Sequence, residues 1–328
     1  MRVPKINYCP GTLAKGYHTY SRACLNRVFN GRSVSHLLPY SAPAVDEKTD
    51  ELYVENQQHI SISGVQVKYS VLLEKNKLRL THVGEQGTHI LKPIPAGVKN
   101  ADQMPANEHL TMQIANQVFG IETAANAMIF FKDGGPCYIT KRFDVKEERG
   151  KWAKEDFASL AGRTPQTHGE HYKYLGSYQE LFELMRQHLP AYHIEAPKLY
   201  KLIGFNYLFS NGDAHFKNFS LIENPHGDFR LSPAYDLLNS KIHIDDKDFA
   251  LDDGLLPKKL AKGNVKKQFL QLAEYGGLSQ KQTDRIWNEL VSGEDKVTAL
   301  IEASYLNEKT KRNYLQSYQT RYKKLIKE

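Results

Sequence analysis

Apolar residues follow two different spacings along this chain of 328 residues, and the change falls between residues 144 and 152. Before the change, alternating or continuous apolar stretches predict five strands, at residues 68–73, 78–82, 88–92, 127–131 and 137–143. A helix is predicted among them, because Leu110, Ile114 and Val118 share one helical face and Gly120 ends the pattern. This part of the chain is therefore predicted to be rich in β-structure.

After residue 152 the apolar spacing is mainly helical, with one interruption at residues 211–238. Two short strands are predicted inside the interruption, at residues 219–222 and 228–232, and an apolar helix at residues 199–209 precedes them. We therefore predict an α+β fold with two domains, a β-rich one at residues 1–144 and a mainly helical one at residues 145–328.

The composition excludes several classes of protein. Hydrophobic residues make up 41% of the chain, but the longest apolar runs, such as residues 124–131, fall far short of the ~18 residues of a membrane span. Residues 1–5 lack the apolar stretch of a secretory signal. Cys9, Cys24 and Cys137 contain no C-x-x-C pair, which argues against a disulfide framework or a zinc module. We expect a cytoplasmic protein with no membrane partner.

The net charge of +7 suits an anionic partner, such as a nucleotide, a nucleic acid or an acidic protein surface. Part of the excess is local, since residues 305–328 contain seven Lys or Arg and two Glu. In this helical stretch Leu315, Tyr318, Tyr322 and Leu325 lie on one side. The pattern favours a solvated helix that docks through its apolar stripe over a nucleic-acid arm.

Two weak signals for phosphate chemistry come first along the chain. Residues 61–68 (SISGVQVK) form a small, flexible segment before a predicted hairpin, where Gly64 would let backbone N–H groups approach phosphate oxygens. Lys92 ends the third predicted strand and Glu108 lies early in the next helix, so the carboxylate could hold the ammonium against a triphosphate. By themselves these residues are more typical of an ordinary turn and an ordinary surface ion pair.

A sharper signal lies at residues 210–220 (SNGDAHFKNFS). Asp213 and Asn218 have the D-x-x-x-x-N spacing of a phosphotransfer loop, in which the Asp accepts the hydroxyl proton and the Asn holds Mg²⁺. Asp236 follows the next strand pair, where protein kinases place their metal-binding Asp. A helix-ending turn would also explain Asp213, and an N-cap would explain Asp236. The joint order of all these signals favours an enzyme that uses ATP and Mg²⁺.

Other catalytic motifs are missing from the sequence. It contains no G-x-x-x-x-G-K-[ST], G-x-G-x-x-G, G-x-S-x-G or H-E-x-x-H. The nearest approach to a metal site is the pair His168 and His171, which we interpret as solvated loop residues because helical context is lacking. Cys137, on an apolar strand, is interpreted as a small core residue.

At this point the chain resembles the HipA family of bacterial serine/threonine kinases, which are toxins of toxin–antitoxin modules. The resemblance spans roughly residues 58–240 and rests on the ordered segments SISGVQVK, ILKP (90–93), NE (107–108), ITKRFD (139–144), EDF (155–157), SNGDAHFKNFS and LSPAYDLL (231–238). It implies a two-lobed protein-kinase-like fold, with a β-rich N-lobe and a mainly helical C-lobe.

The resemblance also implies a role for each matching residue. Asp213 would be the catalytic base, and Asn218 and Asp236 would bind Mg²⁺. ATP would be bound by Gly64 of the turn, by Lys92 with its carboxylate partner Glu108, and by His215 beside the phosphates. The backbone of Lys141 and Phe143 in the hinge would contact the adenine. Ser61 or Ser63 would be the serine that these kinases phosphorylate on themselves.

The chain most resembles HipT, the shortened toxin of three-gene HipBST modules, because only about sixty residues precede the glycine turn. This implies a HipB-like DNA-binding antitoxin and a HipS-like small protein as partners, with DNA reached only through the antitoxin. Aminoacyl-tRNA synthetases, and the tryptophanyl enzyme in particular, would be the substrate. Two alternatives remain: a kinase of a small-molecule or lipid hydroxyl, and a nucleotide-binding pseudokinase that regulates a partner.

Overall fold

The computed structural model describes residues 5–42, 67–146 and 150–327. The predicted glycine turn, with Ser61, Ser63 and Gly64, lies outside these residues. No helix among the described residues is long and apolar enough to cross a membrane.

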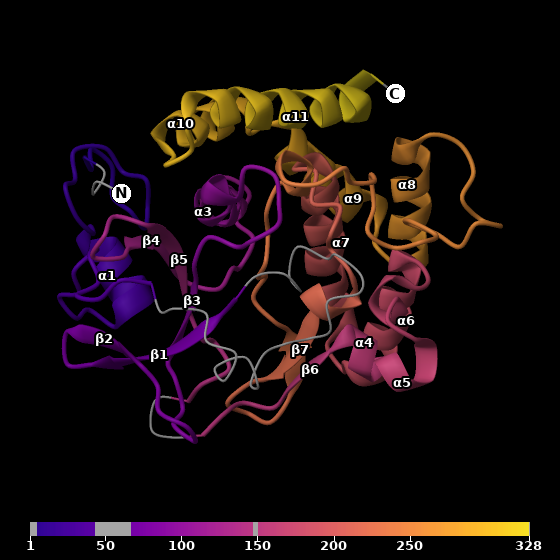
Figure 1. The fold of residues 1–328 in the computed structure, drawn as a ribbon. Coiled ribbons are helices and arrows are strands. Elements are labelled where there is room, and N and C mark those ends of the chain that lie inside the picture. The colour runs from indigo at the N-terminus through magenta and orange to yellow at the C-terminus, as the bar shows by residue number, and fades with distance from the viewer. Residues whose placement is uncertain (1–4, 43–66, 147–149, 328) are drawn as a thin grey trace.

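An antiparallel sheet of five strands forms the first half of the described chain, in the order β2-β1-β3-β5-β4 (Figure 1). Its strands agree with the predicted ones to within two residues: β1 (Tyr69–Glu74), β2 (Lys77–Leu80), β3 (His89–Lys92), β4 (Asn126–Phe130) and β5 (Pro136–Lys141). Lys75 adopts a left-handed conformation that closes the β1–β2 turn. The apolar alternation therefore predicts this sheet correctly.

Both faces of the sheet are covered, which explains why every residue of β4 is buried. On one face Ala127 and Ile129 pack with Cys137 against α1 (Arg22–Phe29). On the other face Met128 and Phe130 join the main core, to which α3 (Met104–Gln117) also contributes. The interpretation of Cys137 as a core residue is confirmed, since its side chain is fully buried.

The second half of the chain is helical around a small antiparallel sheet of order β6-β7-β8. The sheet consists of the predicted strands β7 (Ser220–Glu223) and β8 (Phe229–Leu231), joined by β6 (Lys154–Asp156), which sequence analysis missed. The helices are α4 (Phe157–Leu160), α5 (Pro165–His168), α6 (Tyr178–His188), α7 (Tyr192–Leu208), α8 (Val265–Tyr275), α9 (Gln280–Val291), α10 (Glu294–Ala303) and α11 (Glu308–Lys327). Short 3-10 helices are η2 (Ala101–Gln103), η3 (Tyr172–Tyr174), η4 (Phe216–Asn218) and η5 (Ser240–Ile242).

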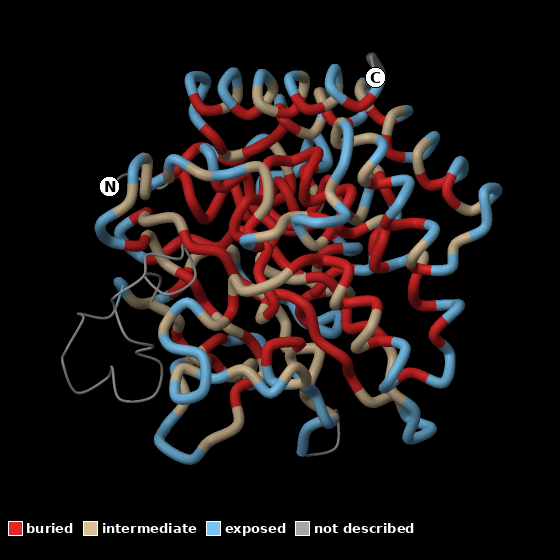
Figure 2. Tube along the Cα trace, turned by 90° about the vertical axis from the view of Figure 1, so that its right-hand side faces the viewer, coloured by how far each residue is buried: buried red, intermediate tan, exposed pale blue. Residues whose placement is uncertain are grey.

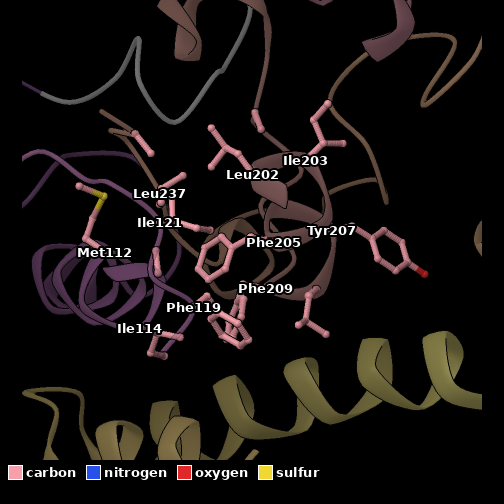
Figure 3. Close-up of a cluster of buried hydrophobic side chains, with 14 of the residues drawn as sticks. Met112, Ile114, Phe119, Ile121, Leu202, Ile203, Phe205, Tyr207, Phe209 and Leu237 are labelled. Carbon is pink, nitrogen blue, oxygen red and sulfur yellow. The ribbon is translucent and has the colours of Figure 1, made fainter. Parts of the chain in front are cut away.

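One aromatic cluster joins the two halves. Phe119, just after α3, lies with its ring centroid 5.7 Å from that of Phe205 and 5.6 Å from that of Phe209, at the end of α7 (Figure 3). Phe209 also stacks on Tyr318 of α11, at 5.0 Å. These contacts fix α3, which belongs to the first half, against the helix that leads into the Asp213 loop. The division into domains at residues 144–145 stays a prediction.

The C-terminal helix α11 lies across the top of the molecule, above α3 and α7 (Figure 1). Tyr318 and Leu325 are buried, and Leu315 and Tyr322 pack against the main core at its edge. Figure 2 shows the same division, with buried residues on the inner turns of this helix and exposed ones on its outer side. The predicted docking of the helix through its apolar stripe is confirmed.

Candidate active site

A buried lysine connects the two halves of the molecule at the candidate site. Lys92 ends β3, where it pairs with Tyr138 of β5, and only 4% of its surface is exposed. Its Nζ donates to Glu108 Oε1 of α3 at 2.6 Å and also contacts Asp236 Oδ1, from the segment after β8. The predicted Lys92–Glu108 pair is therefore present, and Asp236 completes a three-membered cluster.

The electrostatics of this cluster are dominated by burial and by mutual pairing. Burial by itself would lower the pKa of Lys92, but the charges of Asp236 and Glu108 outweigh it and raise that pKa. Burial pushes the pKa of Asp236 upward, and the charge of Lys92 overcomes this and lowers it. Burial raises the pKa of Glu108, with Lys92 opposing. The cluster holds one ammonium against two carboxylates, which suits a site that receives a further cation.

Asp236 does not cap a helix, since no helix begins at Leu237. Its backbone is left-handed, with φ of 56°, a conformation that Asp tolerates better than most residues. The preceding residue, Tyr235, donates its hydroxyl to the carbonyl of Lys217 at 2.8 Å. This bond ties the Asp236 segment to the loop of residues 210–220, and so brings the two predicted metal ligands toward one place.

The loop that carries Asp213 begins where α7 ends. Ser210 has a left-handed backbone, with φ of 54°, and the N–H of Gly212 donates to Ser240 Oγ at 2.9 Å. A Cβ at position 212 would lie 2.5 Å from the carboxylate of Asp246 and from the carbonyl of Lys247. Only glycine therefore fits here, because the segment after η5 packs directly against the loop.

Asp213 is buried, and its carboxylate has a partner that sequence analysis missed. The hydroxyl of Tyr174, on η3, donates to Asp213 Oδ1 at 2.8 Å. The Tyr174 ring stacks on His171 at 5.0 Å and meets the edge of His215 at 5.1 Å. No motif indicated Tyr174; the only trace in the sequence is its place in a segment with tyrosines at 172, 174 and 178.

His171 is exposed, as expected for a solvated loop residue, and it also has defined partners. Its Nε2 lies 3.0 Å from the carboxylate of Asp252 while its ring supports Tyr174. His168 is exposed, and its Nδ1 lies 2.8 Å from Thr167 Oγ1. Over the described ranges, no group of three or more His, Cys, Asp or Glu side chains could hold a metal ion by itself. His171 therefore supports the tyrosine that contacts Asp213, whereas His168 contacts its own turn.

His215 and Asn218 lie on the same short turn as Asp213. The N–H of His215 donates to Asn218 Oδ1 at 3.1 Å, which leaves that oxygen a second lone pair. The His215 ring is buried, and within the described part of the chain neither ring nitrogen has a hydrogen-bond partner. Burial and the charge of Lys173 hold the pKa of His215 well below its usual value, so the ring is neutral.

The predicted hinge residues lie at the end of β5. The N–H of Lys141 donates to the carbonyl of Ala125 at 2.7 Å, so this donor already has a partner inside the sheet. The Lys141 side chain reaches away, to Asn30 Oδ1 at 2.6 Å. The ring of Phe143 lies 5.8 Å from that of Tyr235, with Lys154 Nζ near both rings. Phe143 thus adjoins the Asp236 segment through Tyr235, while the Lys141 side chain extends toward the end of α1.

The family of this chain follows from its similarity to known proteins. The sequence profile of the HipA-like C-terminal domain matches residues 60–297. The chain belongs to this HipA-like family. A protein of Haemophilus influenzae named "Putative kinase" is 24% identical over 227 residues, which are 67% of this chain and 63% of the relative. "Putative kinase Y4dM" of Sinorhizobium fredii is 29% identical over 254 residues, 73% of this chain and 59% of the relative. The chain thus spans less than two thirds of the length of these HipA-like relatives.

Two solved structures resemble the HipA-like chain in fold. HipA from the Shewanella oneidensis complex of HipA, HipB and operator DNA matches with a TM-score of 0.64 and 20% identity, over 89% of this chain and 74% of that one. The Helicobacter pylori proinflammatory kinase CtkA matches with a TM-score of 0.52 and 14% identity, over 78% of this chain and 90% of that one. The predicted kinase-like fold, a curled β-sheet with a helical part, is confirmed.

Proposed function

We propose that this protein is an ATP-dependent serine/threonine protein kinase that acts as the toxin of a bacterial toxin–antitoxin module. The observation that carries the proposal is the buried cluster of Lys92, Glu108 and Asp236, tied through Tyr235 to the loop that holds Asp213. A fixed ammonium, a pair of metal-ligating oxygens and a buried carboxylate base are the groups that phosphoryl transfer requires.

Asn218 and Asp236 are the residues that would hold Mg²⁺, and their donor atoms fit it, since Mg²⁺ prefers a few carboxylate or amide oxygens. Bound Mg²⁺ would neutralise charge on the ATP phosphates. Lys92, held by Glu108, would bind the phosphates, with neutral His215 beside them. The adenine would lie at the hinge of residues 139–144, against the backbone of Lys141 and Phe143.

Asp213 would accept the proton of the acceptor hydroxyl, while Tyr174 holds its carboxylate in one orientation. Gly64 would let the turn at residues 61–68 lie over the phosphates. The charge of Lys68, at the end of that segment, acts on Asp236 and Glu108, which supports this placement. Ser61 or Ser63 would receive a phosphate from the protein itself.

We further propose that the toxin is of the HipT type, on the basis of its paired serines in the SIS sequence. A HipB-like antitoxin and a HipS-like small protein would be its partners, and DNA would be reached through the antitoxin. The Shewanella complex, in which HipA occurs together with HipB and operator DNA, supports the first of these partners. Tryptophanyl-tRNA synthetase is the proposed substrate.

Comparison of the wild type with Asp213→Gln tests the enzymatic proposal. The wild type should turn over ATP only with Mg²⁺ present and transfer phosphate to a protein in a cell extract, identified by mass spectrometry. Asp213→Gln should keep ATP binding and lose transfer by ~10²–10⁴-fold or more. If phosphate were transferred only to small molecules or lipids, the protein would be a metabolite or lipid kinase and not a protein kinase. Nucleotide binding without turnover in the wild type would indicate a pseudokinase.

A further inference from the structure

A cavity of about 430 Å³ lies between η5 and α11 and contains none of the candidate site residues. Among the described residues that line it, none is acidic and five are basic: Lys99, Lys241, Lys309, Arg321 and Lys324. They come from three separate parts of the chain, so only the fold brings them together. The cavity is therefore a concentrated positive surface and not the solvated face of one helix.

Among the described residues, the ion pairs of these cations converge on one carboxylate. Asp248 accepts from Arg321 Nη2 at 2.6 Å, and its oxygens lie 3.5 Å from Lys241 Nζ and 3.8 Å from Lys324 Nζ. For Lys99 and Lys309 no ion pair occurs within the described ranges. The charges of Lys241 and Arg321 also act on a second carboxylate, Asp246, which accepts from Ser240 Oγ. Five cations against these two carboxylates still leave an excess of positive charge that a bound anion would neutralise.

Two buried polar side chains also belong to the wall of the cavity. Arg321 is 2% exposed, and its Nε lies 3.4 Å from Ser210 Oγ. Asn239 is fully buried, and neither its side-chain oxygen nor its nitrogen has a hydrogen-bond partner in the part of the chain that is described. Burying an unpaired amide is costly, and this one belongs to a residue of the cavity wall, although its polar atoms are themselves covered.

We propose that this cavity binds a small phosphate-bearing anion, either free phosphate or pyrophosphate or the phosphate of a mononucleotide. Lysine ammonium groups bind phosphate as charged hydrogen-bond donors, and four of them line the cavity. The volume of the cavity lies within the range of small-ligand pockets, and it is too small to hold a folded protein. Ser210, three residues before Asp213, forms part of the same wall, so the ligand would contact the start of the Asp213 loop.

The test uses two double variants with equal charge change. Lys309→Gln/Lys324→Gln removes two exposed cations from the cavity, and Lys258→Gln/Lys259→Gln removes two exposed lysines that do not line it. Each protein is titrated by calorimetry with inorganic phosphate, pyrophosphate and a 5′-mononucleotide. The cavity variant should bind the preferred anion about tenfold or more weakly than the wild type, because hydrogen bonds to charged groups contribute about that much. The control variant should bind within twofold of the wild type.

Both variants leave the Lys92 site intact, so the difference in binding between them reports on this cavity and is independent of the proposed kinase activity. A larger loss for the mononucleotide than for pyrophosphate in the cavity variant would assign the phosphate to a nucleotide, and the reverse would assign it to a free anion. Equal affinity in the cavity variant, the control and the wild type would overturn the proposal. An equal loss in both variants would also overturn it, since that result reports only net charge.

Discussion

Replacement of Tyr174 by Phe is the sharpest test of how the site is positioned. The change removes one atom, the hydroxyl oxygen that donates to Asp213 Oδ1 at 2.8 Å, and keeps the ring that stacks on His171. A hydrogen bond to a charged group contributes about 1.5–3 kcal/mol. If the bond holds the base in its reactive orientation, its loss corresponds to a decrease of kcat by about 10- to 150-fold.

The assay measures kcat and the KM for ATP separately, by phosphate transfer at saturating acceptor. Because the lost hydroxyl bonds the base Asp213 while the ring contacts are kept, we expect kcat to fall while the KM for ATP stays within about twofold. Tyr322→Phe is the matched control, since it removes a tyrosine hydroxyl that donates to the carbonyl of Val291 at 3.1 Å, a neutral acceptor. An unchanged kcat in Tyr174→Phe, or an equal loss in the control, would refute the positioning role.

Three further predictions concern the ligands, the buried charges and the serines. Asp236→Asn should weaken the binding of a nonhydrolysable Mg-ATP analogue more than Asp213→Gln does, because it removes a charged metal ligand; equal affinities by calorimetry would count against Asp236. Lys92→Met should destabilise the fold by about 3–5 kcal/mol, because it leaves Glu108 and Asp236 unpaired. This loss of stability should grow as the pH rises and both carboxyls ionise, which denaturant unfolding at several pH values measures. Adding Glu108→Gln to the variant should restore part of the stability. Intact-mass measurement should find added phosphate on Ser61 or Ser63 in the wild type and none in Asp213→Gln, and a wild type without phosphate after incubation with Mg-ATP would disprove self-phosphorylation.

Local patterns predicted the elements of this protein well, because apolar spacing depends on neighbours along the chain. The five strands of the larger sheet, α3 and the docked helix α11 all follow from that spacing. β6 was missed because its residues, Lys-Glu-Asp, are charged and become a strand only by pairing with β7. Tertiary pairing overrides local propensity for such a short, polar segment.

The candidate site was likewise predicted from the sequence only in part. The sequence alone determined the order of its parts, since Lys92, Glu108, Asp213, Asn218 and Asp236 stand in motifs whose spacing is readable. Only the tertiary structure decided that Asp236 shares Lys92 with Glu108 and that Tyr174 holds Asp213. The same is true of Asp246, which lies where a side chain at position 212 would be. The basic cavity beside α11 likewise joins residues more than two hundred positions apart. Such contacts depend on how the helices pack around the core, which brings together side chains that no local spacing relates.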